Sequence, residues 1–147
     1  MAVEFASPGD EPWIRQLLIS CGLPQEDLHG DHFKHFLVYK EKGLILGVVG
    51  LEIFGKVALL RSLAVNGPHR NRGIASQMVA KIEEYARSLQ ISKLYLLTTS
   101  AEEFFAKRGY QRSDRKLAPL EIRTTREFQE ICPDSSVCLS KDLGGSP

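Results

Sequence analysis

The sequence predicts an α+β protein with a mixed α/β sheet, in which an antiparallel meander is followed by a β-α-β crossover. Three extended runs follow one another, at residues 33–40, 44–54 and 57–65. Short turns that contain Gly43 and Gly55 join them, which is the pattern of consecutive antiparallel strands. From Gly73 the apolar residues recur at helical spacing, and a β-branched run at 93–98 follows. A strand, a helix and a further strand in this order predict the crossover.

Before the meander, the chain predicts a short strand at 3–6 and one helix. Asp10 is suited to cap this helix, and Gly22 with Pro24 ends it. The apolar residues of the helix recur at helical spacing and are expected to face the core: Trp13, Leu17, Leu18 and Cys21. The polar residues 24–31 then predict a loop over a binding site.

The later elements follow from the same signals. The long helix has an apolar face of Ile74, Met78, Val79, Ile82, Tyr85, Ala86 and Leu89. Glu83 and Arg87 are expected to form an i,i+4 pair on its solvent side. Ser100 is expected to cap a short helix at 101–108 that Gly109 closes. The tail predicts a helix start at 125–128, a break at Pro133 and a last strand at 137–143.

Length, composition and charge limit the classes of function that the chain can have. The 147 residues, with 43% hydrophobic and 25% charged side chains, predict one globular domain over 1–147. A formal charge of +1 argues against a protein that coats a polyanion, so nucleic acid is not an expected partner. The first residues do not resemble a secretory signal, and the longest apolar stretch, 44–51, is too short to span a bilayer.

The cysteines indicate the compartment. Cys21, Cys132 and Cys138 form no C-x-x-C pair, and an odd number fits a reducing environment. We therefore expect three free thiols in a cytoplasmic protein without a membrane partner.

The most informative segment for function is residues 65–76. A strand ends there, a loop with Gly67 and Pro68 turns, and a basic stretch opens the long helix. The first turn of a helix presents backbone N–H groups and the positive end of the helix dipole, which together suit a phosphate or pyrophosphate. Gly73 allows close approach, and Arg70 and Arg72 add charge. Taken alone, a basic helix start with one glycine is more often an ordinary solvated cap than an anion site.

Three motifs in order resemble the GCN5-related N-acetyltransferase (GNAT) family. Its signature, Arg/Gln-x-x-Gly-x-Gly/Ala, corresponds to RNRGIA at 70–75. A Leu-Ala-Val strand at 63–65 precedes it, and AEEFFAKRGY at 101–110 matches a later family segment. The resemblance implies the GNAT acyl-CoA N-acyltransferase fold, with acetyl-CoA as the cosubstrate.

The resemblance also implies where the cosubstrate binds. Backbone near Ala64 and Val65 would pair with the pantetheine, and the amides of 70–76 would hold the pyrophosphate. The residues expected to contact acetyl-CoA are Leu63, Ala64, Val65, Arg70, Asn71, Arg72, Gly73, Ile74, Ala75, Ser76, Thr98 and Phe105.

A narrower likeness concerns the arsenic-resistance-associated branch of these acetyltransferases. It rests on GLE at 50–52, LLTT at 96–99, TTREF at 124–128 and Cys132-Pro133. This likeness implies an arsenic-containing toxicant as one candidate substrate.

Glu52 is the predicted catalytic base, because burying a carboxylate in the apolar strand 44–54 is costly and a functional role would explain its presence there. A two-residue turn at Gly55 would place Glu52 opposite Leu59, with Arg61 diagonal on the same face. The structural alternative is that Glu52 only pairs with Arg61 or faces solvent.

The sequence departs from the family pattern at two positions. Phe105 stands where many members have a tyrosine acid, and Thr98 replaces an asparagine. The general acid is therefore unassigned, with Thr99, Ser100 or water as candidates. Tyr110 and Tyr95 are expected to pack in the interior.

Two further groups of side chains are candidate ligands. His29, His32 and His35 lie near Asp27 and Asp31, but an extended segment at His35 would keep the histidines apart, so no metal site is expected. Arg61, Arg123 and Arg126 suit a substrate carboxylate, with ordinary surface charge as the favoured alternative for each.

The leading function is therefore N-acetylation of a small-molecule amine, either amino-acid-like or arsenic-containing. The alternatives are a noncatalytic acetyl-CoA-binding module and, less favoured, a cysteine-based arsenical sensor. An exposed sheet edge or the last strand also leaves a homodimer open.

Overall fold

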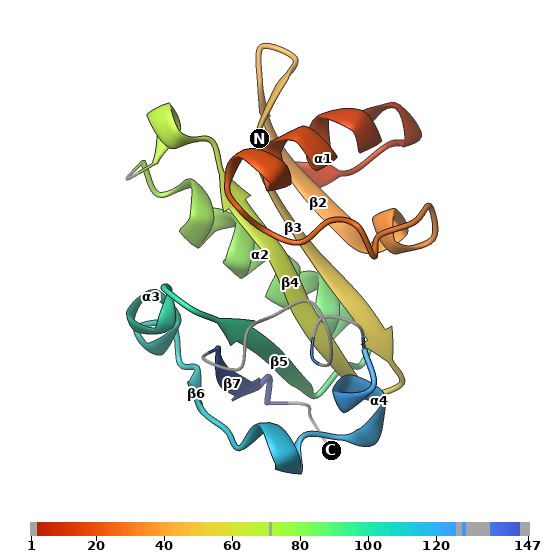
Figure 1. The fold of residues 1–147 in the computed structure, drawn as a ribbon, viewed down its shortest axis with the longest axis vertical. Coiled ribbons are helices and arrows are strands. Elements are labelled where there is room, and N and C mark those ends of the chain that lie inside the picture. Colours follow the sequence, from red (N-terminus) through yellow and green to blue (C-terminus); the bar gives the residue numbers. More distant parts are fainter. Residues whose placement is uncertain (1–2, 71, 126–127, 129–135, 145–147) are drawn as a thin grey trace. The chain divides into compact units, whose positions relative to one another are not determined.

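The computed structural model describes residues 3–70, 72–125, 128 and 136–144 (Figure 1). Its strands are β1 (Val3–Phe5), β2 (Phe36–Glu41), β3 (Leu44–Phe54), β4 (Val57–Val65), β5 (Lys93–Thr98), β6 (Gln111–Arg112) and β7 (Val137–Asp142). Its α-helices are α1 (Glu11–Ser20), α2 (Ile74–Ser88), α3 (Glu102–Ala106) and α4 (Leu120–Arg123). The strands form one mixed sheet in the order β1-β2-β3-β4-β5-β7-β6, which confirms the predicted fold class.

The chain forms two compact units. The first comprises Met1–Glu52 and Arg61–Tyr85, and the second comprises Ile53–Leu60 and Ala86–Pro147. Consequently β3, β4 and α2 each contribute residues to both units. The single domain expected from chain length stays a prediction.

In the first unit, β2 pairs antiparallel with both β1 and β3. The register places Phe36 opposite Gly50, and any Cβ at Gly50 would overlap the Phe36 ring. The core on one side of these strands includes Ile14, Leu17, Leu18, Phe33, Phe36, Val38 and Val48. Figure 1 shows α1 in front of these strands and α2 behind them. The sheet in this unit is therefore covered on both faces.

Two predictions about α1 and β2 are wrong. Trp13 is 66% exposed and lines a surface hollow beside Leu44, because the buried stripe of α1 is centred on Ile14 and Leu18. The strand expected from residue 33 starts only at Phe36, because His32–His35 form a 3-10 turn that buries Phe33 against Phe36.

Most of the predicted apolar face of α2 is confirmed, since Ile74, Met78 and Ile82 are buried. Glu83, expected on the solvent side, is 6% exposed. The reason is its position, because residue 83 falls within the buried stripe 79, 82, 83 and 86. Leu89 lies beyond the end of α2 and is exposed.

In the second unit, the start of β4 pairs parallel with β5, and β7 pairs antiparallel with β5 and β6. Its core includes Leu59, Tyr95, Ala118, Ile122, Phe128 and Cys138, so the burial of Tyr95 is confirmed. Ser100 does not cap α3, whose N-cap is Ala101. The Thr98 hydroxyl instead accepts the backbone N–H groups of Ser100 and Ala101, at 3.3 and 2.9 Å.

The tail is predicted only in part. Strand β7 is confirmed, one residue shorter than expected, whereas α4 was not expected at all. Arg126 and Glu127 of the helix start expected at 125–128, and Pro133, lie outside the described residues.

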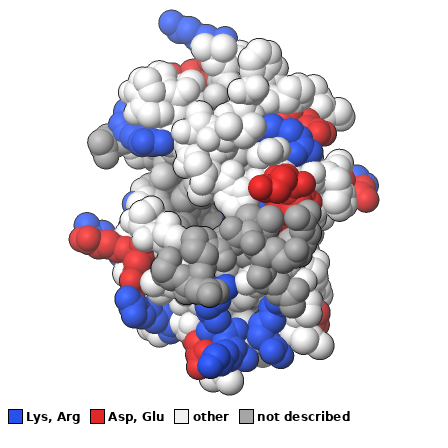
Figure 2. Space-filling model, in the orientation of Figure 1, with Lys and Arg blue, Asp and Glu red and all other residues white. Residues whose placement is uncertain are grey.

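The surface bears on the expected partners. Figure 2 shows basic and acidic side chains together on the face it draws, in keeping with the formal charge of +1. Among the helices of the described residues, none is long and apolar enough to cross a membrane.

Candidate functional site

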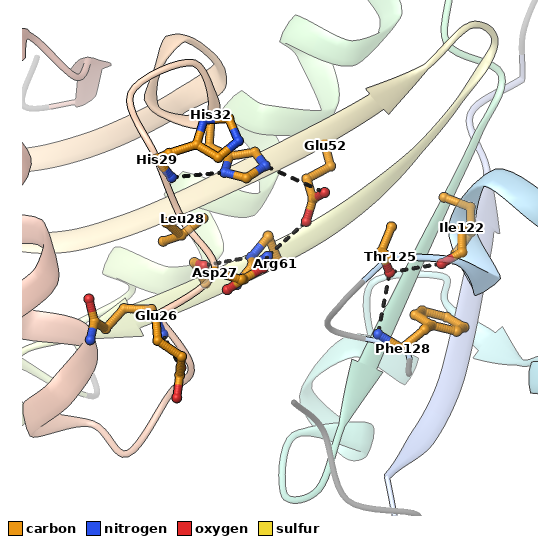
Figure 3. A network of polar contacts seen from close by, with 12 residues as sticks. Glu26, Asp27, Leu28, His29, His32, Glu52, Arg61, Ile122, Thr125 and Phe128 are labelled. Carbon is orange, nitrogen blue, oxygen red and sulfur yellow. Dashed lines mark hydrogen bonds and ion pairs between the residues drawn. The ribbon is translucent and has the colours of Figure 1, made fainter. Parts of the chain in front are cut away.

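A buried ion-pair cluster lies in the first unit, around Arg61 of β4 (Figure 3). The Arg61 side chain is fully buried, and its Nη1 donates to Glu52 Oε2 of β3 at 2.7 Å. The same guanidinium donates two hydrogen bonds to Asp27, in the loop after α1, from Nη1 to Oδ2 at 2.5 Å and from Nη2 to Oδ1 at 2.9 Å. One cation therefore holds two carboxylates that are distant in sequence.

This contact confirms that Glu52 pairs with Arg61, which is the structural alternative to a base role for Glu52. Arg61 is not the surface charge favoured for it, because its side chain has no exposed area and is committed to Asp27 and Glu52. The base role of Glu52 stays a prediction. Its carboxylate is 12% exposed, so it is the most accessible of these three groups.

A local departure from strand geometry completes the environment of Arg61. Ser62 has a φ of 63°, in the left-handed region that non-glycine residues rarely adopt. Successive side chains of a regular strand point to opposite faces. Here Arg61 and Ser62 are both buried, and Arg61 Nε donates to Ser62 Oγ at 3.2 Å.

The charge state of Asp27 follows from its surroundings. Burial by itself would raise the pKa of the Asp27 carboxyl, but the hydrogen bonds and charge of Arg61 outweigh it and the pKa is lowered. Asp27 is therefore a fixed negative partner of Arg61.

His32 joins the cluster from the 3-10 turn. Its Nε2 lies 3.7 Å from Glu52 Oε1, and its Nδ1 accepts the backbone N–H of His29 at 3.1 Å. The two histidine rings are 4.1 Å apart, so the expectation that the histidines stay separate is wrong for this pair. His35 is separate, with its Nδ1 2.8 Å from the Tyr85 hydroxyl.

The protonation of His32 is also shifted. Burial lowers the pKa of His32, more than the facing charge of Glu52 raises it. The imidazole is thus neutral near pH 7. Within the described part of the chain, no group of three or more His, Cys, Asp or Glu side chains is arranged to hold a metal ion.

The segment expected to bind an anion lies at the start of α2, also in the first unit. A 3-10 turn at Gly67–His69 follows β4, and α2 begins at Ile74. Gly73 is exposed, has a φ of +80°, and leaves nothing within 4 Å of where a Cβ would stand. The backbone is therefore open to a ligand at this helix start.

The two arginines of this segment brace the loop. Arg70 Nε donates to the Val65 carbonyl at 3.1 Å, and its Nη2 lies 3.4 Å from Cys21 Sγ. Arg72 contacts His69 Nδ1 and Glu41 Oε2, each at 2.7 Å. Both guanidinium groups therefore already have protein partners at the predicted anion site.

The remaining predicted cofactor residues divide between the units. Leu63, Ala64, Val65, Ile74, Ala75 and Ser76 lie with Arg70, Arg72 and Gly73 in the first unit, whereas Asn71 is outside the described residues. Thr98 and Phe105 belong to the second unit. The Phe105 ring is 4% exposed and packs edge-on against Tyr110, 5.2 Å between centroids, which confirms the packing role of Tyr110.

Sequence reasoning missed Asp27 and His32 as members of the Glu52 cluster. A signal existed, because an arginine in the apolar run LLRSLAV needs more compensation than Glu52 alone provides. Asp27, in the polar loop at 24–31, supplies the second carboxylate.

Comparison with known proteins addresses the same segments. The family model described as "Acetyltransferase (GNAT) family" matches residues 3–112. An amino-acid acetyltransferase of Aeromonas salmonicida is 32% identical over 110 residues, covering 74% of this chain and 24% of the relative. The chain thus spans about a quarter of that relative's length.

Solved structures show the same fold. N-acetylglutamate synthase from Neisseria gonorrhoeae, in complex with coenzyme A and N-acetyl-glutamate, superposes with a TM-score of 0.84 at 25% identity. The match covers 97% of this chain and 35% of that one. A Staphylococcus aureus acetyltransferase matches 96% of this chain and 98% of its own, with a TM-score of 0.75 at 15% identity, which speaks for the fold alone.

Proposed function

We propose that this chain, which belongs to the acetyltransferase (GNAT) family, moves the acetyl group of acetyl-CoA to the amine of a small, amino-acid-like molecule. One observation carries the proposal: the family match over residues 3–112 includes both the open helix start at Gly73 and the Glu52 cluster. The backbone proposed to bind the anion and the proposed carboxylate base therefore both lie within the residues that the family model matches.

The helix start fits the diphosphate of a nucleotide thioester. Gly73 is open to its surroundings, and the first turn of α2 supplies backbone donors without needing the side chains of Arg70 and Arg72. When bound, acetyl-CoA supplies an activated acyl thioester. The coenzyme A in the Neisseria gonorrhoeae complex supports this choice of cosubstrate.

Glu52 would remove the proton of the incoming amine. An amine is largely an ammonium at pH 7 and has no lone pair for attack until it loses a proton. Arg61 donates to Glu52 Oε2, whereas His32 Nε2 lies 3.7 Å from Oε1, beyond hydrogen-bond distance, so Oε1 keeps a lone pair to take that proton. The cluster also attracts a cation, because two carboxylates and one guanidinium leave one net negative charge.

The departing thiolate has no tyrosine to protonate it at position 105. A thiol has a pKa of about 8.5, so it leaves tolerably as the anion. Thr99, Ser100 or water remain the candidate proton donors. The buried, packed ring of Phe105 argues for a structural role at that position.

An amino acid is the favoured acceptor because the curated relatives are named amino-acid acetyltransferases. Its carboxylate would be held by a group other than Arg61, which is occupied by Asp27 and Glu52. An arsenic-containing amino acid is the more specific candidate, supported by the segment likeness at 50–52 and 96–99.

The test is a screen for release of the coenzyme A thiol. The panel contains glutamate and other amino acids, amino-bearing arsenicals and phosphinates, polyamines and aminoglycosides. Turnover with an amino-acid-like amine is the expected result. Binding of acetyl-CoA with no turnover on any amine would favour the noncatalytic module, and no binding at all would overturn the proposal.

A further inference from the structure

We propose that His32 is a positioning residue that holds the Glu52 carboxylate through its Nε2–H, with its tautomer fixed by the backbone N–H of His29. The role rests on the proposed function, because it matters only if Glu52 acts on the amine. The geometry that carries it is the chain of contacts from His29 through His32 to Glu52 in Figure 3.

The tautomer follows from the donor at His29. A neutral imidazole has one protonated and one unprotonated nitrogen. Nδ1 of His32 accepts the backbone N–H of His29 at 3.1 Å, so Nδ1 cannot carry the proton. The hydrogen therefore sits on Nε2, the nitrogen that faces Glu52 Oε1.

N–H groups then face Glu52 from two sides. Arg61 donates to Oε2 at 2.7 Å, and His32 Nε2 faces Oε1 at 3.7 Å. The second contact is longer than a hydrogen bond, as catalytic contacts often are before substrate binds. A carboxylate that is bonded at Oε2 and faced by an N–H at one lone pair of Oε1 keeps its orientation when the amine arrives, while the second lone pair of Oε1 stays available for the proton.

The backbone under His32 is itself anchored. Arg15 of α1 donates to the carbonyls of Gln25 and Leu28, at 2.9 and 2.8 Å, and its guanidinium lies over the Phe33 ring. Arg61 ties the same loop through Asp27. His32 is thus carried on a segment held by two arginines.

The charged and titratable groups that surround His32 are His29, Asp27, Glu52 and Arg61. Protonation of His32 would put a hydrogen on Nδ1, directly against the His29 N–H. The surroundings therefore favour the neutral ring, which faces Glu52 with its Nε2–H and leaves the charge of the cluster unchanged.

The kinetic test compares two replacements of His32. His32→Gln keeps an amide donor near the position of Nε2, whereas His32→Asn is too short to offer one there. If this contact tightens into a charge-assisted hydrogen bond when the amine binds, its loss predicts a drop in kcat of about tenfold or more for His32→Asn. We expect an unchanged KM for acetyl-CoA in both variants and substantial recovery of kcat in His32→Gln.

His35→Asn is the matched control, since His35 sits in the same 3-10 turn but contacts Tyr85. Equal kcat values for His32→Asn and His35→Asn, or no recovery in His32→Gln, would overturn the positioning role. Thermal unfolding of each variant separates a folding defect from a kinetic one.

A second measurement needs no turnover. Long-range ¹⁵N–¹H NMR of the histidine rings, with His32→Asn used for assignment, reports which nitrogen carries the proton. Protonated Nε2 and bare Nδ1 at pH 7 is the expected result, and the reverse tautomer or a charged ring would refute the inference. A chain that shows this tautomer but no acetyl transfer would contradict the proposed function alone.

Discussion

The Arg61 guanidinium and the Asp27 carboxylate form a two-pronged ion pair across 34 residues of sequence, with both side chains almost wholly buried. The pair ties the loop after α1 to the middle of β4. Because Glu52 shares the same guanidinium, the stability of the loop and the geometry of the candidate base are linked.

Asp27→Asn should lower the free energy of unfolding by about 3 kcal/mol, because it leaves Arg61 buried with half of its compensation removed. Urea denaturation measures the change. Glu26→Gln is the matched control, since it makes the same change in charge one residue away on an exposed side chain. Equal stability of the two variants would mean that the pair contributes little to folding.

The same pair predicts how stability depends on pH. The pKa of Asp27 is lowered from its ordinary 3.8 in the folded state. A carboxyl with a lowered pKa stabilises the folded chain above its unfolded pKa, and this contribution is lost as the pH falls through the folded value. The Tm of the parent should therefore fall more steeply below about pH 4 than that of Asp27→Asn. Parallel Tm curves between pH 5 and pH 2 would contradict the assignment.

Glu52→Gln should lower kcat by about 100-fold or more, with little change in the KM for acetyl-CoA, because general-base assistance is lost. Glu84→Gln, on an exposed position of α2, is the control. An undiminished kcat across the pH range would remove Glu52 from the mechanism.

The same Glu52→Gln variant should lower the pKa of His32 further, because the facing carboxylate charge that raises it is removed. Titration of the His32 ring by NMR measures the shift. A higher pKa in the variant would mean that Glu52 does not face His32 in solution.

Gly73→Glu should weaken coenzyme A binding by roughly tenfold or more, since it adds bulk and negative charge at the start of α2. Gly43→Glu is matched to it, because Gly43 has the same φ of +80° and equally open surroundings in the β2–β3 turn. Calorimetric titration should show near-parent affinity for the control. Tight binding by Gly73→Glu would exclude this helix start as the diphosphate site.

The sequence predicts the elements whose signals are local. β3, β4 and β5 have the expected bounds, because apolar runs with strong strand propensity end at turn residues such as Gly43 and Gly55. Gly55 has a φ of 66°, so the turn between β3 and β4 uses the conformation that glycine adopts most easily.

The elements it does not predict depend on distant partners. The pairing of Asp27 with Arg61 joins residues from different elements, which hydropathy patterns do not encode. The same holds for His32, whose role depends on a backbone N–H three residues before it and a carboxylate twenty residues after it.

The left-handed backbone conformation at Ser62 also matters for any design that reuses this strand. A regularly alternating strand would send an arginine and its successor to opposite sides of the sheet. Because the backbone of β4 departs from this alternation at Ser62, the Arg61 guanidinium lies beside the Ser62 hydroxyl that accepts its hydrogen bond. A designed sheet that borrows LLRSLAV but straightens it would bury the arginine without that companion and would need another acceptor in its place.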